Sequence, residues 1–263
     1  MYVLTPSTAP QKYNVAFERK LRSRIEINPY RKGGELMTRE TFQLIENYML
    51  ECMDPLDVAH GAEHIRRVLH TALDIAAHEE NVNTDVLICA CLLHDIGRRA
   101  QAENPTIRHP IKGAEMARAF LEQNGFSESL ASHVASCIRV HSAYDDHADS
   151  IEARILYDAD KLDIVGALGI ARTLLYSARH CEPLYSRDSN GNILDGSGNA
   201  GRHSFLHEYH HDQQETANGF HTARAAEIAA QRRQAAEAFY HSLLCEIREA
   251  ECLGKDLLKN ILQ

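Results

Sequence analysis

The sequence predicts an all-α fold, a helical bundle built as one domain with a C-terminal helical extension. Two observations carry this prediction. Hydrophobic residues recur at helical spacing almost without a break after Thr38, and the apolar run Val86–Leu93 lacks the alternation of a half-buried strand. With 263 residues, 44% of them hydrophobic and 25% charged, the chain is long enough for a sizeable core, and its composition does not indicate global disorder.

Residues 1–37 are predicted to form an irregular N-terminal arm. Prolines at positions 6, 10 and 29 and the pair Gly33-Gly34 interrupt any helical period, although a short helical piece is expected near residues 15–24. The first 40 residues carry eight basic and four acidic side chains, whereas the whole chain has a net charge of −9. We interpret this basic cluster as a solvated tail rather than a surface for a partner or a membrane.

Residues 38–180 are predicted to form the core of the domain. Residues 86–93 are apolar on every side, which is typical of a buried helix. A helix over residues 111–124 ends at Gly125, another runs from Ser127 to residue 141, and residues 151–178 hold one or two more. An amphipathic helix precedes them, with an inner face formed by Ile65, Val68, Leu69, Ala72, Ile75 and Ala76.

Residues 181–263 are predicted to contain a Gly/Asn-rich loop and C-terminal helices that pack on the same domain. The loop covers residues 185–202, with a small hairpin at Asn190-Gly191, and it fails as a calcium loop because no Glu closes it. The final helix is expected from about residue 222 to residue 249. Its predicted inner side consists of Ala225, Ile228, Ala229, Ala236, Phe239, Tyr240, Leu243 and Ile247.

Composition and charge exclude several classes of function. The longest apolar run has eight residues, far fewer than the roughly 20 of a membrane span, and no secretory signal is evident. An acidic chain with 6% aromatic residues and no Trp is poorly suited to a nucleic acid polymer. The seven cysteines form no CxxC pair and indicate reduced thiols in a cytoplasmic protein. The oligomeric state is not predictable from the sequence.

Two segments place metal-type ligands next to apolar residues. His94 and Asp95 follow the buried run directly, where they cost several kcal/mol unless they are paired with each other or bind a metal ion. His60 and His64 lie four residues apart on a helix, as in zinc proteases. Gly61 occupies the position where those enzymes need Glu, so a protease of that type is disfavoured.

Two further segments add candidate ligands. Asp158, Asp160 and Asp163 lie within an apolar helical pattern and need a cation or several hydrogen-bond donors, although Lys161 could neutralise one of them. The segments RHPIKGAE and IRVHS supply one histidine each, which taken alone are more often surface or capping residues. In chain order the candidates read H…HD…H…H…D, at His64, His94, Asp95, His109, His141 and Asp160.

This order resembles the HD-domain metal-dependent phosphohydrolase superfamily over about residues 40–250. Within it the sequence is most similar to the bacterial YedJ- and YpgQ-like HD proteins. The similarity is carried by the segments AEHIRRVL, LLHDIGR, HPIKGAE, IRVHS and DADKLDIVGALGIARTLLYS. The resemblance implies an HD-domain helical bundle with a divalent metal ion held by His64, His94, Asp95 and Asp160. Such a ligand set suits Mn, Fe, Co, Ni or Mg.

The remaining roles follow from the need of phosphoryl transfer for positive charge and positioning. The predicted catalytic residues are Asp95, Arg67 and Lys161. A second metal ion is left open, because the resemblance places further ligands of two-metal members at His109 and His141. These histidines are otherwise expected to bind the substrate phosphate, together with Arg98 and Lys112. Each of the basic residues could equally form a local salt bridge, and Asp158 or Asp163 is expected to orient a ligand histidine.

The predicted function is therefore hydrolysis of a small phosphate ester or anhydride, with a nucleotide as the expected substrate. Two departures from the family keep alternatives open: Arg98 and Arg99 stand where some HD nucleotidases carry an acid, and Asp212 stands where nearer relatives tend to have Lys. The alternatives are a catalytically weak nucleotide-sensing HD module and an HD-type di-iron oxygenase. The GYP signature of cyclic-dinucleotide phosphodiesterases is absent, which disfavours that activity.

Overall fold

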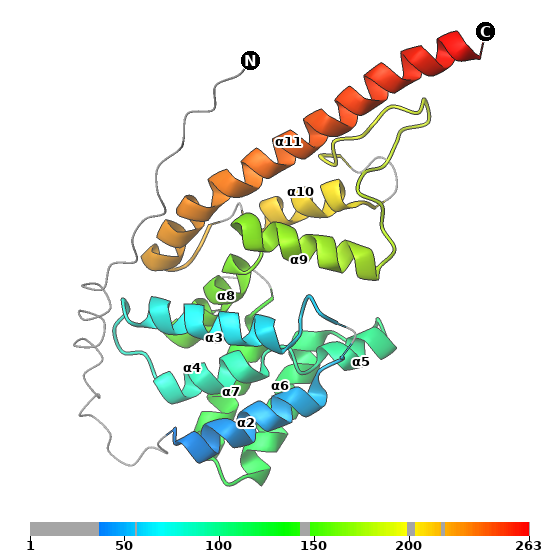
Figure 1. Cartoon of the computed structure of the whole chain (residues 1–263). Helices are drawn as coiled ribbons and strands as arrows, with labels where there is room; N and C mark the ends of the chain where they lie inside the picture. The colour runs from blue at the N-terminus through cyan, green and yellow to red at the C-terminus, as the bar shows by residue number, and fades with distance from the viewer. Residues whose placement is uncertain (1–36, 56, 143–147, 199–202, 217–218, 263) are drawn as a thin grey trace. The chain divides into compact units, whose positions relative to one another are not determined.

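The computed structural model describes residues 37–55, 57–142, 148–198, 203–216 and 219–262 (Figure 1). In this part of the chain the regular structure is helical, and β-structure is limited to one isolated bridge between Arg187 and Ile193. The predicted all-α class is therefore confirmed, and the bridge closes the turn expected at Asn190-Gly191. The predicted arm before Met37, with its short helical piece, lies outside the described residues. No described helix is both long enough and apolar enough to cross a bilayer.

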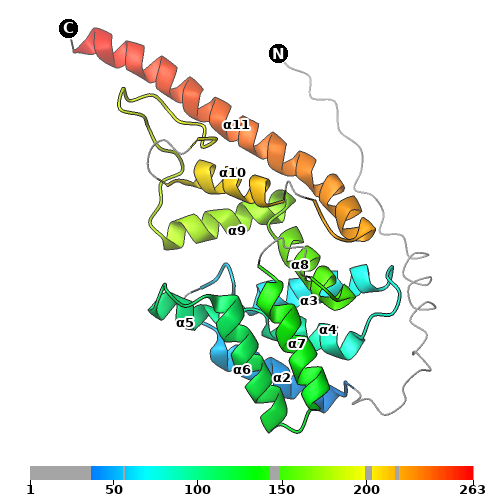
Figure 2. The same cartoon turned by 180° about the vertical axis from the view of Figure 1, so that it is seen from behind.

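The helices follow the predicted order closely, and Figures 1 and 2 show them from opposite sides. Residues 151–178, expected to hold one or two helices, form two. In chain order the helices are α2 (Arg39–Cys52), α3 (Ala62–Ala76), α4 (Thr84–Leu93), α5 (Arg98–Glu103), α6 (His109–Gln123), α7 (Glu128–Val140), α8 (Ile151–Leu162), α9 (Gly166–Arg179), α10 (Phe205–Glu215) and α11 (Ala223–Ile261).

Helix α4 lies at the centre of the main hydrophobic core. Its residues from Val86 to Leu93 are almost all buried, as the sequence predicted, and it contacts α2, α3, α7 and α8. The Asn83 side chain caps its start by accepting hydrogen bonds from the backbone N–H groups of Asp85 and Val86. Helix α4 ends at Leu93 inside the protein, and the next two residues, His94 and Asp95, are therefore buried.

A second, smaller core joins α9, α10 and α11, which lie alongside one another in both views (Figures 1 and 2). Its buried members include Phe205 and Tyr209, and the Tyr209 ring stacks on Tyr240 with centroids 4.8 Å apart. Two expectations about the last helix were wrong. Phe239 is 40% exposed while Leu244 is buried. The face of α11 that packs in the smaller core contains Ala236, Tyr240 and Leu244 instead. The helix also continues to Ile261, since a lone Gly254 among good helix formers does not end it.

Asp158 of α8 anchors the start of α11. Its carboxylate is fully buried and accepts three hydrogen bonds, from the His221 N–H at 2.9 Å, the Thr222 N–H at 2.8 Å and the Thr222 hydroxyl at 2.7 Å. Thr222 in turn is the N-cap residue of α11 and accepts a hydrogen bond from the Ala225 N–H. One carboxylate therefore fixes where the longest helix begins.

We predict that Asp158→Ala lowers the free energy of unfolding by about 3 kcal/mol, because it leaves three donors near the start of α11 without their acceptor. Urea unfolding followed by circular dichroism measures this loss. Asp149→Ala, which removes an exposed carboxylate just before α8, is the control and should change stability by about 0.5 kcal/mol or less. Equal stability of the two variants would contradict the anchoring role.

Candidate metal centre

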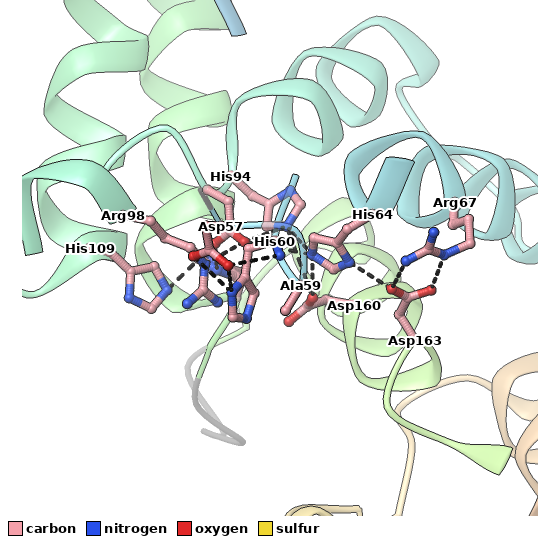
Figure 3. A network of polar contacts seen from close by, with 12 residues as sticks. Asp57, Ala59, His60, His64, Arg67, His94, Arg98, His109, Asp160 and Asp163 are labelled. Carbon is pink, nitrogen blue, oxygen red and sulfur yellow. Dashed lines mark hydrogen bonds and ion pairs between the residues drawn. The ribbon is translucent and has the colours of Figure 1, made fainter. Parts of the chain in front are cut away.

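Five separate elements bring together the four predicted metal ligands and the two histidines predicted to bind substrate or a second ion. Residue 64 lies on α3, residues 94 and 95 follow α4, residue 109 begins α6, residue 141 follows α7 and residue 160 lies on α8. Figure 3 labels four of the six, His64, His94, His109 and Asp160, which come from four of these elements and lie close together. The structure thus brings together His64, His94, Asp95, His109, His141 and Asp160.

One half of the cluster surrounds the Nε2 atoms of His64 and His94, which are 3.3 Å apart. Asp160 Oδ1 lies 3.3 Å from His64 Nε2 and 3.9 Å from His94 Nε2. Asp95 Oδ2 lies 3.6 Å from each of the two imidazole nitrogens. Two nitrogens and two carboxylate oxygens therefore converge on one small volume, with donors of the kind that bind a divalent ion.

The other half of the cluster faces the second oxygen of Asp95. His109 Nε2 lies 3.6 Å and His141 Nε2 3.5 Å from Asp95 Oδ1. All three of these atoms are buried, and none has a hydrogen-bond partner among the described residues. Buried polar atoms without partners are costly, and a cation placed among them would satisfy all three. The Asp95 carboxylate therefore stands between two groups of histidines.

The histidines are oriented by hydrogen bonds at their other ring nitrogen. His94 Nδ1 donates to the Cys91 carbonyl at 2.8 Å, and His141 Nδ1 donates to the Ile138 carbonyl at 2.7 Å. Because a carbonyl only accepts, each Nδ1 carries the proton and each Nε2 keeps a free lone pair. Lone pairs aimed at the cluster are what metal coordination by imidazole requires.

His64 is oriented by a carboxylate instead. Its Nδ1 lies 2.7 Å from Asp163 Oδ2. Asp163 also accepts two hydrogen bonds of 2.9 Å from the Arg67 guanidinium, and its Oδ2 lies 3.1 Å from Arg172 Nη1. Of the two carboxylates expected to orient a ligand histidine, Asp163 occupies that position, whereas Asp158 holds α11. The structure directs Arg67 toward Asp163 and away from the cluster, as Figure 3 shows.

The electrostatics prepare most of the cluster for a cation, but the carboxylates around His64 raise the pKa of this imidazole to about 9, so it gives up a proton when an ion binds. Burial alone would raise the pKa of Asp95, but Arg98 and the neighbouring histidines hold it well below its usual value, and His64 does the same for Asp160. Burial lowers the pKa of His94 to about 4 and that of His109 to about 3. At neutral pH both carboxylates are therefore charged, and these two imidazoles are neutral donors.

A close approach of backbones places His109 in the cluster. A Cβ atom on Gly97 would collide with the His109 carbonyl and the Gly113 backbone, so only glycine allows α6 to pack this tightly against the turn after Asp95. Gln101 Oε1 then accepts a hydrogen bond of 3.1 Å from the His109 N–H and lies 2.6 Å from its Nδ1.

A cavity of about 270 Å³ opens beside the cluster, with His109 and Asp160 in its wall. Arg98 and Lys161, two of the predicted substrate-contacting residues, line it, and Arg98 Nε also donates to Asp95 Oδ2. Lys112 does not line it, because this lysine lies on the exposed side of α6 beside Glu115. Arg67 does not line it either, since Asp163 holds its guanidinium.

The wall also contains residues that sequence reasoning did not select. Arg172, Thr173 and Tyr176 come from α9, and Glu208 and His211 from α10, beside Asp212, which the resemblance had already marked as a departure from the family. Arg172 could have been found from the sequence, since a charged residue within the apolar pattern of α9 needs a partner; its Nε donates to the Ala59 carbonyl at 2.9 Å. Glu208 and His211 had no such signal, because no helix was predicted over that segment.

The comparisons with known proteins agree with this geometry. Residues 61–164 match the HD domain family model, and this range contains all six residues of the cluster. The resemblance inferred from the sequence is therefore confirmed over this range. No curated protein matches the chain. HD domains bind divalent metal ions, and the buried His/Asp cluster has a donor set that fits one.

Solved structures with the same fold cover most of the chain. A predicted HD superfamily hydrolase from an uncultured Thermotogales bacterium is 28% identical, with a TM-score of 0.53, over 78% of this chain and 91% of its own. An HD-superfamily hydrolase from Bacillus thuringiensis is 25% identical, with a TM-score of 0.58, over 80% and 97%. Bacillus subtilis YpgQ in complex with ADP is 23% identical, with a TM-score of 0.55, over 80% and 96%.

We predict that Asp163→Asn weakens metal binding by about tenfold or more, although it leaves all six cluster residues in place, because it removes the charge that orients His64. Competition with a chromophoric chelator measures this affinity. The matched control is Asp74→Asn on the same helix as His64, where the carboxylate pairs with Arg224 at 2.9 Å. Unchanged affinity in Asp163→Asn would show that Asp163 does not position the ligand.

Proposed function

We propose that this protein is a metal-dependent phosphohydrolase that acts on a small phosphate ester or anhydride. The observation that carries the proposal is the convergence of four imidazoles and two carboxylates beside a cavity that basic side chains line. A bound divalent ion supplies Lewis-acid polarisation of a phosphoryl group and lowers the pKa of its water. The protein's own groups hold the ion, position the substrate and neutralise charge.

Within this proposal His64, His94, Asp95 and Asp160 are the metal ligands. Asp95 presents one oxygen to each half of the cluster, and the partnerless Nε2 atoms of His109 and His141 face its Oδ1, which favours a second ion on that side. Asp163 and Arg67 act on the ion only through His64, so they are positioning residues. The wall residues Arg98 and Lys161 bring positive charge to the transferred phosphoryl group.

A nucleotide is the substrate class that fits best. The cavity of about 270 Å³ lies near the lower end of ligand pockets, which hold roughly 300–1,000 Å³, and so suits a small molecule rather than a polymer. Arg172 adds a buried guanidinium to the wall, and Tyr176 adds an aromatic ring on which a base can stack. The complex of YpgQ with ADP supports the same class of ligand for this fold.

We predict that the purified protein, loaded with Mn, Co, Ni or Mg, releases phosphate or pyrophosphate from at least one compound in a panel of nucleotides and sugar phosphates. Asp95→Ala should lose bound metal and about 1,000-fold in activity, since removing a stabilisation of several kcal/mol changes a rate tenfold per 1.36 kcal/mol. Asp74→Ala is the control. Hydrolysis by Asp95→Ala at the parent rate would refute the proposal.

The acidic part of the cavity wall leads to a second prediction. Asp212 Oδ2 accepts a hydrogen bond of 2.7 Å from the Thr173 hydroxyl, and it lines the same cavity as Arg98 and Lys161. Its negative charge opposes a second phosphate group. Asp212→Asn keeps an acceptor for Thr173 but removes that charge, so KM for a nucleoside diphosphate should fall about fivefold while kcat stays unchanged. Steady-state kinetics measure both constants.

Glu227→Gln, a change on the exposed side of α11, is the matched control for this charge removal. A nucleoside monophosphate serves as a second comparison, because it has no further phosphate for the wall to repel. Equal KM values for the parent and Asp212→Asn with the diphosphate would mean that the charge of this residue does not act on the substrate.

A further inference from the structure

Four histidines lie in α10 or just before it, at positions 203, 207, 210 and 211. This segment lies outside residues 61–164 and contributes nothing to the buried cluster. His203 precedes the helix, and His207 and Glu208 lie in its first turn. The ligand-type atoms of these three residues all lie within 4.8 Å of one another.

The contacts among the three side chains are specific. His203 Nδ1 lies 3.0 Å from Glu208 Oε1, and the rings of His203 and His207 meet edge to face with centroids 4.7 Å apart. A surface ion pair between an imidazole and a carboxylate contributes little stability and gives no reason for a second imidazole to join it. Two imidazoles and one carboxylate within reach of one atom are instead a donor set for a transition metal.

The backbone under these side chains is held firmly. Ser204 is buried, its carbonyl accepts a hydrogen bond of 3.0 Å from the Glu208 N–H, and its hydroxyl accepts one of 3.3 Å from the His207 N–H. The N–H groups of Phe205 and Leu206 donate to the carbonyls of Pro183 and Leu184, and both side chains are buried in the smaller core. Two of the three donors therefore project from a fixed turn, which limits the entropy lost when an ion binds.

We propose that His203, His207 and Glu208 form a second metal site, separate from the buried centre, which binds a zinc-class transition ion. Imidazole donors favour Zn²⁺, Cu²⁺, Ni²⁺ or Co²⁺ over Mg²⁺ and Ca²⁺, which prefer oxygen ligands. His203 is exposed, so water completes the coordination and the ion exchanges with solvent. The proposal does not depend on the activity assigned to the buried centre.

The location gives this site a consequence for the cavity. Glu208 lines the same cavity as His109 and Asp160, and His211 and Asp212 of the same helix line it too. An ion held by Glu208 adds positive charge to a wall that otherwise carries two carboxylates from α10. The surface site and the buried centre therefore share one cavity, although they share no ligand.

Counting bound zinc tests the proposal. The full chain, stripped of metal, is titrated with Zn²⁺ against a chromophoric chelator. The double variant His203→Ala/His207→Ala should bind one ion fewer per chain than the parent. Glu208→Gln preserves the shape of the side chain and should weaken that ion by about 100-fold, since even outer partners of a metal site are worth about 10–100-fold.

The matched control is His70→Ala/His78→Ala, which removes two exposed histidines from the region of α3 and should bind as many ions as the parent. Asp95→Ala should keep the ion of the surface site, which separates this site from the buried centre. Equal zinc stoichiometry in the parent and the His203→Ala/His207→Ala variant overturns the proposal. So does a loss of one ion in the control as large as that in the double variant.

Discussion

Two carboxylates, the buried Asp95 and the partly buried Asp160, lie among four imidazoles at the centre of a helical protein. Moving an ionised carboxylate out of water costs several kcal/mol even after the surroundings relax, and two close together also repel each other. Arg98 offsets part of this cost through its hydrogen bond to Asp95, but Asp95 Oδ1 keeps no hydrogen-bond donor among the described residues. A divalent cation would complete the balance, and the donor set of the cluster fits one.

Much of the local structure follows from the need to hold these carboxylates and imidazoles together inside the protein. Helix α4 is apolar from Val86 to Leu93 and ends where His94 and Asp95 begin, so that this polar pair lies inside without interrupting a helix. Glycine at position 97 lets α6 approach closely enough for His109 to reach the cluster. Arg67 and Arg172 form ion pairs with the Asp163 carboxylate, and this carboxylate in turn contacts Nδ1 of His64 and orients its ring. Groups outside the cluster thereby orient one of its histidines.

The sequence predicted the helices and the six cluster residues well, because both leave local signals. The spacing of hydrophobic residues predicts the helices, and polar residues at the end of an apolar run indicate the cluster. The direction of the Arg67 side chain was not predictable, because a residue one helical turn from His64 can face either the cavity or Asp163. The contribution of α10 was not predictable either, because residues 205–215 reach the cavity only through the packing of Phe205 and Tyr209 against α11.

The cavity thus has two origins with different chemistry. One part of its lining lies within residues 61–164 and holds His109 and Asp160 of the cluster with Arg98 and Lys161, whereas α10 adds two carboxylates and one imidazole. In the proposed function, the cluster acts with Arg98 and Lys161 on the phosphoryl group, since phosphoryl transfer depends on positive charge and positioning. The carboxylates of α10 would act on the rest of the substrate through their charge. Under this proposal, changes in α10 alter which phosphate compound is accepted without disturbing the cluster, because no cluster residue lies on that helix.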